Sequence, residues 1–233
     1  MYKPLKAIFY RDLFEDCLPQ IFDEIFIKNV YQPYFNGKKD LTVLDVGANI
    51  GLFTLYAYPF SKKIYAIEPA TDHFETLNKF VEFNKMDRVT TIKKAISSKD
   101  GEAELYHCLN TTMHSLFKPL VDQFNQDYEK AYNRKHEDME IEKVPTVTLA
   151  TLFKEQNIDQ VDFLKLDVEG EEAKIFSHSS FEEVATKIKT VFTEVHTWNE
   201  SNINIVRSSF IDRGFSVNKV NYEATSLIVA QRL

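Results

Sequence analysis

Acidic side chains stand at the ends of four short apolar stretches of this sequence. These residues are Asp45, Glu68, Asp167 and Glu194, and His196 follows the last of them by two positions. Carboxylates accept hydrogen bonds from hydroxyl groups, hold cations or take up protons, and imidazole takes up a proton near neutral pH. If these groups lie together, they could bind a cationic ligand and remove the proton of an alcohol.

The stretch Leu41–Gly51 (LTVLDVGANIG) has the pattern of a nucleotide-binding strand and turn. It opens with apolar and β-branched residues, which is typical of a buried parallel strand, and passes through Gly47 and Gly51 into a helix-like apolar stretch. Glycine permits a positive φ or a close approach to a ligand, and the helix N-terminus offers unpaired N–H groups. The pattern predicts a ligand site that includes Gly47, Asn49 and Gly51.

The glycine spacing argues against a dinucleotide. The dinucleotide fingerprint is G-x-G-x-x-G, whereas Gly47 and Gly51 have the spacing G-x-x-x-G, with Asn49 in the middle. Asp45 would repel a pyrophosphate but suits a ligand with an ammonium or a sulfonium. Glu68, 17 positions after Gly51, is placed to accept hydrogen bonds from both ribose hydroxyls. We therefore predict S-adenosylmethionine (SAM) as the cofactor.

Three segments together resemble the FkbM-type family of SAM-dependent methyltransferases. They are Val43–Gly51 (VLDVGANIG), the pair Glu68-Pro69 and Leu164–Gly170 (LKLDVEG). The resemblance extends over about residues 41–200, and LDVEG is its most specific part. It implies a class I, Rossmann-like fold and, most often, methyl transfer to a hydroxyl oxygen. It also implies that a small residue near Ala95 lies close to the adenine.

Methyl transfer to an alcohol requires an in-line arrangement and removal of the hydroxyl proton. Asp167, Glu169 and His196 are the candidate catalytic residues. An unperturbed histidine titrates near pH ~6.5, so His196 is expected to be largely neutral and basic at working pH. The structural alternatives are that Asp167 caps the following helix, that Glu169 shapes a turn with Gly170, and that His196 is a hydrogen-bonded core residue.

A metal site is a second hypothesis for the same residues. Asp167, Glu194 and His196 could hold Mg²⁺ together with water and substrate oxygens. A polar, uncharged segment precedes the charged part of the chain, and its His114 and Ser115 are predicted to contact the donor or the acceptor.

Strands that alternate with helices predict a mostly parallel sheet with helices on both faces. We expect a Rossmann-like α/β fold with seven strands in the main sheet. The expected strands are 41–46, 63–68, 89–93, 95–98, 102–108, 144–149, 161–167, 187–194, 215–220 and 226–230; the expected helices are 52–58, 71–85, 151–157, 171–178 and 199–213. Asp100-Gly101 is expected to join 95–98 to 102–108 as a hairpin, and the last two strands form a closing antiparallel pair.

Residues 1–233 are predicted to form one domain with two additions to the minimal core. Residues 1–40 contain an amphipathic helix, ending before Pro33, that covers a sheet edge or the ligand mouth; plain core packing is the alternative. Residues 109–143 are longer than an ordinary loop and carry many charges with partial helical periodicity. We interpret them as a helical lid over the acceptor site, with a solvated surface helix as the alternative.

Composition excludes several classes of function. The net charge is −7 and no dense cluster of Lys and Arg occurs, which disfavours a nucleic-acid substrate. The longest uncharged run, Val46–Ser61, has 16 residues and is too short and polar to span a membrane. Cys17 and Cys108 are far apart and lack metal-ligand spacing, which indicates reduced thiols and a cytoplasmic location.

The leading prediction is a SAM-dependent O-methyltransferase that acts on a sugar, a glycan or another polyhydroxylated small molecule. A nicotinamide-dependent oxidoreductase is the first alternative, and the glycine spacing and Asp45 oppose it. A non-catalytic SAM-binding partner of a larger assembly is the second, and the presence of Asp167, Glu169 and His196 opposes it.

Overall fold

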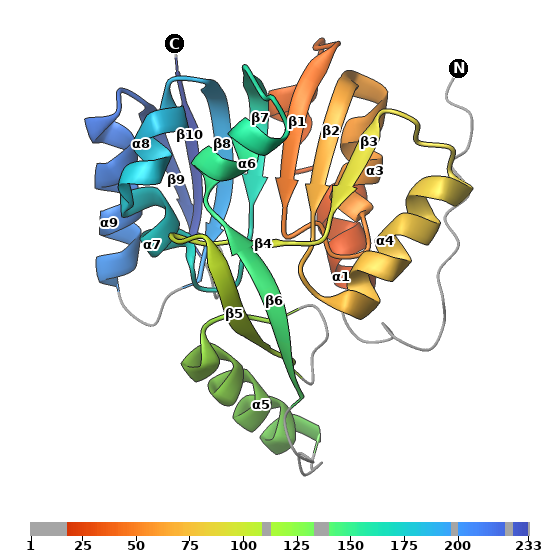
Figure 1. The fold of residues 1–233 in the computed structure, drawn as a ribbon, viewed down its shortest axis with the longest axis vertical. Coiled ribbons are helices and arrows are strands. Elements are labelled where there is room, and N and C mark those ends of the chain that lie inside the picture. Colours follow the sequence, from red (N-terminus) through yellow and green to blue (C-terminus); the bar gives the residue numbers. More distant parts are fainter. Residues whose placement is uncertain (1–17, 109–112, 133–139, 197–199, 222–225, 233) are drawn as a thin grey trace.

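A seven-stranded sheet forms the centre of the molecule (Figure 1). The computed structural model describes residues 18–108, 113–132, 140–196, 200–221 and 226–232. The strand order is β3-β2-β1-β7-β8-β10-β9, and β10 is antiparallel to β8 and β9 while the other neighbours are parallel. The strands are β1 (Leu41–Val46), β2 (Ser61–Ile67), β3 (Val89–Ile92), β7 (Val161–Leu166), β8 (Ile188–Val195), β9 (Ser216–Asn221) and β10 (Ser226–Gln231). The predicted mostly parallel sheet and the closing antiparallel pair are confirmed.

Helices cover both faces of this sheet. One layer contains α1 (Leu18–Phe22), a π-helix (Asp23–Ile27), α2 (Gln32–Phe35), α3 (Leu52–Ala57) with a 3₁₀ turn (Tyr58–Phe60), and α4 (Thr71–Phe83). The other layer contains α6 (Leu149–Glu155), α7 (Glu172–Ser177), α8 (Ser179–Ala185) and α9 (Glu200–Asp212). Val43 of β1 packs into the first layer and Leu44 into the second, because successive strand side chains point to opposite faces.

A smaller sheet lies beyond the end at which the parallel strands finish (Figure 1). Its order is β4-β6-β5, and helix α5 comes between β5 and β6 in the chain. The elements are β4 (Ala95–Ile96), β5 (Gly101–Tyr106), α5 (Lys118–Tyr132) and β6 (Ile141–Val147). The predicted hairpin between 95–98 and 102–108 is wrong, because β6 lies between the two strands and pairs with both. Asp100 does not close a hairpin; its carboxylate accepts hydrogen bonds from Thr148 and Thr151 at the start of α6.

Two prolines occupy unexpected positions. Pro33 lies in the first turn of α2, where the fixed φ of proline fits a helix, and does not end a helix before it. Proline is usually confined to sheet edges and strand starts, yet Pro145 lies within β6, the middle strand of the small sheet. The pairing with β4 involves only Thr146 and Val147, so that side of β6 is not paired at Pro145.

Three smaller features concern the start of α4, the two cysteines and the lengths of the helices. Ala70, and not Thr71, occupies the N-cap position of α4, and the Thr71 hydroxyl donates to Glu142 of β6. Cys108 is buried and forms no disulfide among the described residues, and its Sγ donates to Asn125 Oδ1 at 3.2 Å; Cys17 and the rest of 1–17 lie outside the described residues. Among the helices that the structure describes, none has the length and apolar character needed to cross a membrane.

Candidate functional site

A cavity of about 740 Å³ opens where β1, β2, β7 and β8 end. This is the position at which ligands bind in open parallel sheets. Its wall includes the predicted site residues Gly47, Asn49, Glu68, Ala95, His114, Asp167, Glu169, Glu194 and His196. Asp45, Gly51 and Ser115 were also predicted to contact a ligand but do not line the cavity.

The glycine turn after β1 brings the backbone close to the end of β7. Gly47 has a φ of 73°, and a Cβ at this position would lie 1.9 Å from the backbone oxygen of Asp167. Gly51, with a φ of 97°, is the N-cap of α3, and a Cβ there would lie 2.8 Å from the Leu77 side chain. Both positions therefore require glycine: Gly47 forms the cavity floor and Gly51 allows α3 and α4 to pack closely.

The carboxylate of Glu68 is fixed beside this turn at the end of β2. It accepts a hydrogen bond from the Asn49 backbone N–H at 2.8 Å and another from the Ala70 N–H at 3.0 Å. Only 5% of Glu68 is exposed, yet it lines the cavity. A buried carboxylate held by two backbone donors keeps further lone pairs for ligand hydroxyl groups.

Asp45 lies beneath the glycine turn, away from the cavity. The register of β1 and β7 places it directly opposite Lys165, and both side chains lie on the face of the sheet that packs against α3. The Thr54 hydroxyl donates to Asp45 Oδ2 at 2.5 Å, and Lys165 Nζ lies 3.9 Å from Asp45 Oδ1. Burial raises the pKa of Asp45, although Lys165 and Thr54 act in the opposite direction.

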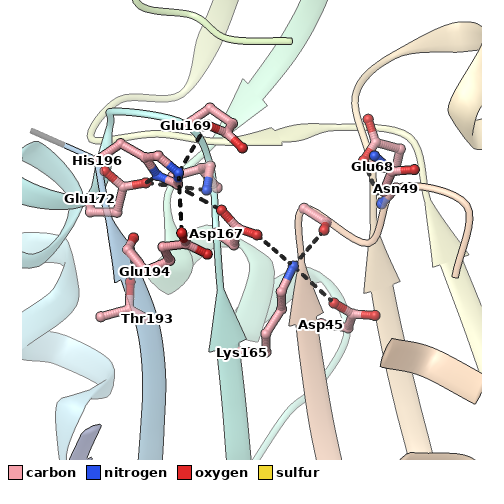
Figure 2. Close-up of polar contacts among 12 residues, drawn as sticks. Asp45, Asn49, Glu68, Lys165, Asp167, Glu169, Glu172, Thr193, Glu194 and His196 are labelled. Atoms are coloured by element: carbon pink, nitrogen blue, oxygen red, sulfur yellow. Dashed lines mark hydrogen bonds and ion pairs between the residues drawn. The ribbon is translucent and has the colours of Figure 1, made fainter. Parts of the chain in front are cut away.

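Lys165 connects three parts of the site, and no role was predicted for it. Its Nζ donates to the Gly47 carbonyl at 2.8 Å and lies 3.3 Å from Asp167 Oδ2 (Figure 2). Despite its burial, the neighbouring charges of Asp167 and Asp45 raise the pKa of Lys165, so it remains a cation. A signal was present in the sequence: Lys165 interrupts the apolar run that leads to Asp167, and a buried lysine needs a partner.

Carboxylates surround His196 just beyond β8 (Figure 2). His196 Nε2 lies 3.1 Å from Glu169 Oε2 and 3.7 Å from Glu194 Oε1. On the other side of the ring, Nδ1 lies 3.4 Å from Glu172 Oε1 and 3.9 Å from Asp167 Oδ1. Figure 2 shows that these contacts continue through Asp167 to Lys165, so that the site is one connected polar network.

These surroundings change the expected ionisation of His196. Burial alone would lower the pKa of His196, but Glu169, Glu172 and Asp167 raise it well above its usual value. Burial likewise raises the pKa of Glu169 far above the ordinary value, although His196 opposes this shift. These contacts favour the imidazolium form of His196 over the neutral base that was expected, because carboxyl oxygens lie within 3.9 Å of both ring nitrogens.

Glu172, for which no role was predicted, holds the turn that carries Glu169. Its carboxylate accepts hydrogen bonds from the backbone N–H groups of Val168 at 3.3 Å and Gly170 at 3.1 Å. The N-cap of α7 is Glu171, without a side-chain cap bond, so the alternative in which Asp167 caps this helix does not hold. Glu169 has a positive φ of 55°, which agrees with a turn-shaping role beside its place in the cavity wall.

The segment before α5 covers the cavity from the small sheet. Met113, His114 and Leu116 line the cavity, but no residue of α5 does. The His114 Nδ1 accepts a hydrogen bond from the Cys108 backbone N–H, and burial lowers the pKa of His114 to about 3. The Ser115 hydroxyl instead donates to the Glu169 carbonyl, so Ser115 fixes the turn from outside the cavity.

The donor set fits the proposed Mg²⁺ poorly. Ligand atoms of Asp167, Glu194 and His196 lie within 4.8 Å of one another. Both nitrogens of His196, however, face carboxylates, and a protonated ring cannot ligate a metal. Mg²⁺ also prefers an all-oxygen shell. The reaction proposed for this site therefore uses no metal ion.

Comparison with known proteins gives the family. The profile of the FkbM methyltransferase domain matches residues 45–217, which is well over half of the chain and includes the site from Asp45 to His196. The chain belongs to the FkbM methyltransferase family. Methyltransferase sdnD of Sordaria araneosa is 28% identical over 237 residues, covering 91% of this chain and 89% of the relative. Methyltransferase 1 of Beauveria bassiana (strain ARSEF 2860) is 32% identical over 169 residues, covering 66% and 64%.

Solved structures share the fold of this FkbM family member at low identity. SMU.1697c of Streptococcus mutans, a putative methyltransferase in complex with SAH, aligns with a TM-score of 0.51 and 10% identity, covering 88% of this chain and 97% of that chain. Precorrin-6y C5,15-methyltransferase of Geobacter metallireducens GS-15 aligns with a TM-score of 0.51 and 11% identity, covering 89% and 88%. The predicted Rossmann-like class I methyltransferase fold is thus confirmed, and membership of a methyltransferase family sets the oxidoreductase alternative aside.

Proposed function

We propose that this FkbM methyltransferase transfers a methyl group from SAM to a hydroxyl oxygen of a sugar, a glycan or another polyhydroxylated small molecule. One observation carries the proposal: a single cavity joins a part lined by Gly47 and Glu68, here called the nucleoside half, to a part lined by Asp167, Glu194 and His196, here called the acceptor half. Carboxylates that face a cavity accept hydrogen bonds from the several hydroxyl groups of such an acceptor.

The nucleoside half suits SAM through the acceptor groups and the small residues of its wall. Glu68 would accept hydrogen bonds from the ribose hydroxyls, because its two backbone donors leave lone pairs unused. Ala95 is small and almost fully buried in the wall, where it leaves room for the adenine. Gly47 and Asn49 line the floor. Asp45 acts at a distance in this assignment, by holding Lys165 and α3 beneath the turn.

Asp167 is the base in the proposed reaction. When bound, SAM supplies an electrophilic methyl carbon, so the acceptor O–C bond forms as the C–S bond breaks and the hydroxyl proton must leave. Asp167 Oδ1 is a buried atom without a hydrogen-bond partner among the described residues, and Asp167 lines the cavity. Lys165 and the His196 imidazolium flank Asp167 and stabilise its negative charge. The proton passes to Asp167 and then to solvent.

His196 is a positioning residue in this scheme. As an imidazolium it holds Glu169 and Glu194 around the acceptor half, at 3.1 Å and 3.7 Å. The segment 109–143 is proposed to act as a lid through Met113, His114 and Leu116, whereas α5 supports them from outside. His114, with Nδ1 accepting from Cys108, would present an Nε2–H donor to the ligands.

A turnover screen tests the function. SAH release is measured with neutral sugars, glycosides and nucleotide-sugars, for the wild type and for Asp167→Asn. We expect turnover of a hydroxyl acceptor that falls about 10²- to 10⁴-fold in Asp167→Asn, while calorimetry gives an unchanged SAM affinity. Asp159→Asn, an exposed carboxylate just before β7, is the matched control and should retain full turnover.

Two results would reject the proposal. One is SAM binding with turnover only on nitrogen or sulfur acceptors, which refutes the hydroxyl assignment. The other is SAM binding without turnover of any acceptor, which favours the non-catalytic partner alternative. A cytoplasmic location and the lack of a nucleic-acid substrate stay predictions from composition.

A further inference from the structure

The N-terminal helices form a second wall of the acceptor half. Side chains from α1, the π-helix and the residues after it line the cavity together with Glu194 and His196; they are Gln20, Ile21, Glu24, Ile25, Lys28 and Tyr31. The sequence predicted only that this segment covers a sheet edge or the mouth. Its lining residues alternate between apolar and polar, so the wall has specific hydrogen-bonding groups on an apolar surface.

Glu24 is the carboxylate in this wall. It lies in the π-helix, whose Lys28 N–H donates to the Asp23 carbonyl at 2.7 Å, a pattern with one extra residue per turn. Glu24 is half-buried beside Ile25, which is only 5% exposed. Glu24, Asp167 and Glu194 line the same cavity, and burial together with the charges of Glu194 and Asp167 raises the pKa of Glu24.

The positive charges of the cavity wall each lie beside at least one carboxylate. Lys28 lies 3.0 Å from Asp23, and Lys94 lies 2.6 Å from Glu155. Lys165 contacts Asp167 and Asp45, and the His196 imidazolium lies among four carboxylates. Asp167 and Glu194 share these cations, so the carboxylate of Glu24 adds a further negative charge to the wall of the acceptor half.

We propose that Glu24 determines acceptor specificity: its carboxylate accepts hydrogen bonds from a neutral, hydroxyl-rich acceptor and repels acceptors that carry a carboxylate or phosphate. The inference rests on the proposed function, since it describes the acceptor half of the same site. Glu24 lies before residues 41–200, over which the family resemblance extends, so the inference adds a specificity residue from outside that region. Specificity by repulsion is a common device where two ligands differ by one charge.

Paired acceptors test the rule directly. Turnover is compared for neutral glycosides and the corresponding uronic acids, and for catechol and its carboxylated analogue, with the wild type, Glu24→Gln and Glu24→Lys. Glu24→Gln should reduce the preference for the neutral member roughly 10-fold, mainly through KM, and Glu24→Lys should reduce it further. SAH affinity by calorimetry should not change. Glu82→Gln, which removes an exposed charge on α4 outside the cavity wall, should keep the wild-type preference.

A chemical probe tests the same charge without an acceptor. Ile21, three residues before Glu24 and also in the cavity wall, is replaced by cysteine. Alkylation of Cys at this site by anionic iodoacetate and by neutral iodoacetamide is measured by peptide mass spectrometry. The ratio of the two rates cancels differences in thiol reactivity. Adding Glu24→Gln should raise the iodoacetate-to-iodoacetamide ratio roughly 3- to 10-fold, whereas adding Glu82→Gln should not.

Together, the paired acceptors and the alkylation probe distinguish a failure of the role of Glu24 from a failure of the proposed function. If Glu24→Gln changes neither the acceptor preference nor the alkylation ratio, the inference is wrong. If Glu24→Gln raises the iodoacetate-to-iodoacetamide ratio and only catechol or its carboxylated analogue is methylated, the repulsion of anionic acceptors by Glu24 is supported. The assignment of a sugar acceptor then fails. If Glu24→Gln raises the alkylation ratio but no acceptor is methylated, the negative charge of Glu24 in the cavity is supported and the proposed methyltransferase function fails.

Discussion

Replacement of Lys165 by methionine is expected to destabilise the protein strongly. Lys165 is 11% exposed and is the cation nearest to Asp45, which is completely buried. Removal of one partner from a buried ion pair typically costs about 3–5 kcal/mol, because an uncompensated charge remains. The contact with Asp167 adds little to this figure, since the Asp167 side chain is 27% exposed. A domain has a total stability of only about 5–15 kcal/mol, so the loss is large.

A double-mutant cycle identifies the cause of this loss. Asp45→Asn in the Lys165→Met background removes the stranded charge but keeps a side-chain oxygen that can accept from Thr54. Replacing both partners of a buried pair is often nearly neutral, so we expect most of the lost stability to return. Lys189→Met is the matched control: Lys189 pairs with Asp162 at 2.7 Å, but its side chain is 53% exposed, and its loss should cost no more than about 1 kcal/mol.

Urea unfolding followed by far-ultraviolet circular dichroism measures these differences at several pH values. Burial raises the pKa of Asp45 and Lys165 counteracts this, so Lys165→Met raises that pKa further. As pH falls through the raised pKa, Asp45 takes up a proton and the deficit of Lys165→Met should shrink. The reasoning is refuted if Lys165→Met costs no more than Lys189→Met, or if Asp45→Asn does not restore stability.

Four further predictions concern the ligands and the lid. Glu68→Ala should weaken SAM binding by roughly 1.5–3 kcal/mol in calorimetry, and an unchanged affinity would remove Glu68 from the site. NAD should not bind in a titration, because Gly47 and Gly51 lack the dinucleotide spacing; micromolar affinity would contradict this. His196→Gln should lose stability relative to the wild type at pH ~6.5 and below, and this difference should disappear as pH rises through the raised pKa of His196; a difference that grows at alkaline pH would contradict it. Replacing 118–139, which spares β6, by a short Gly/Ser linker should preserve SAM binding and lower acceptor turnover; intact turnover would refute the lid.

Local sequence predicted the first strand, the glycine turn and the acidic residue after the second strand correctly. Leu41–Val46 forms the predicted strand, Gly47 and Gly51 both adopt the positive φ expected of the turn, and Glu68 directly follows β2. These features depend on neighbouring residues along the chain and on the rule that parallel strands end at one edge. The prediction of a hairpin at Asp100-Gly101 was wrong. A turn sequence indicates where the chain reverses, but it does not determine which strands pair with each other afterwards.

The chemistry of His196 required the three-dimensional structure. Its sequence neighbours gave no reason to expect a pKa far from the usual value, because Glu169 and Glu172 lie more than 20 positions away along the chain. The place of Glu24 in the cavity wall also required the structure. The packing of α1 and the π-helix against the sheet brings residues before the glycine motif into this wall. An amphipathic pattern predicts which helix face is buried, but not which polar side chain at its border reaches a ligand.

The sequence by itself determined the parallel sheet, the glycine turn, the family resemblance and the strand-end carboxylates, because hydrophobic periodicity and turn chemistry are local properties. Only the tertiary structure decided that Asp45 is a buried partner of Lys165, that carboxyl groups on both sides of His196 raise its pKa, and that the N-terminal helices line the cavity. Charge states and cavity walls are set by groups that meet through strand register and helix packing, and their distances in space are not encoded in their spacing along the chain.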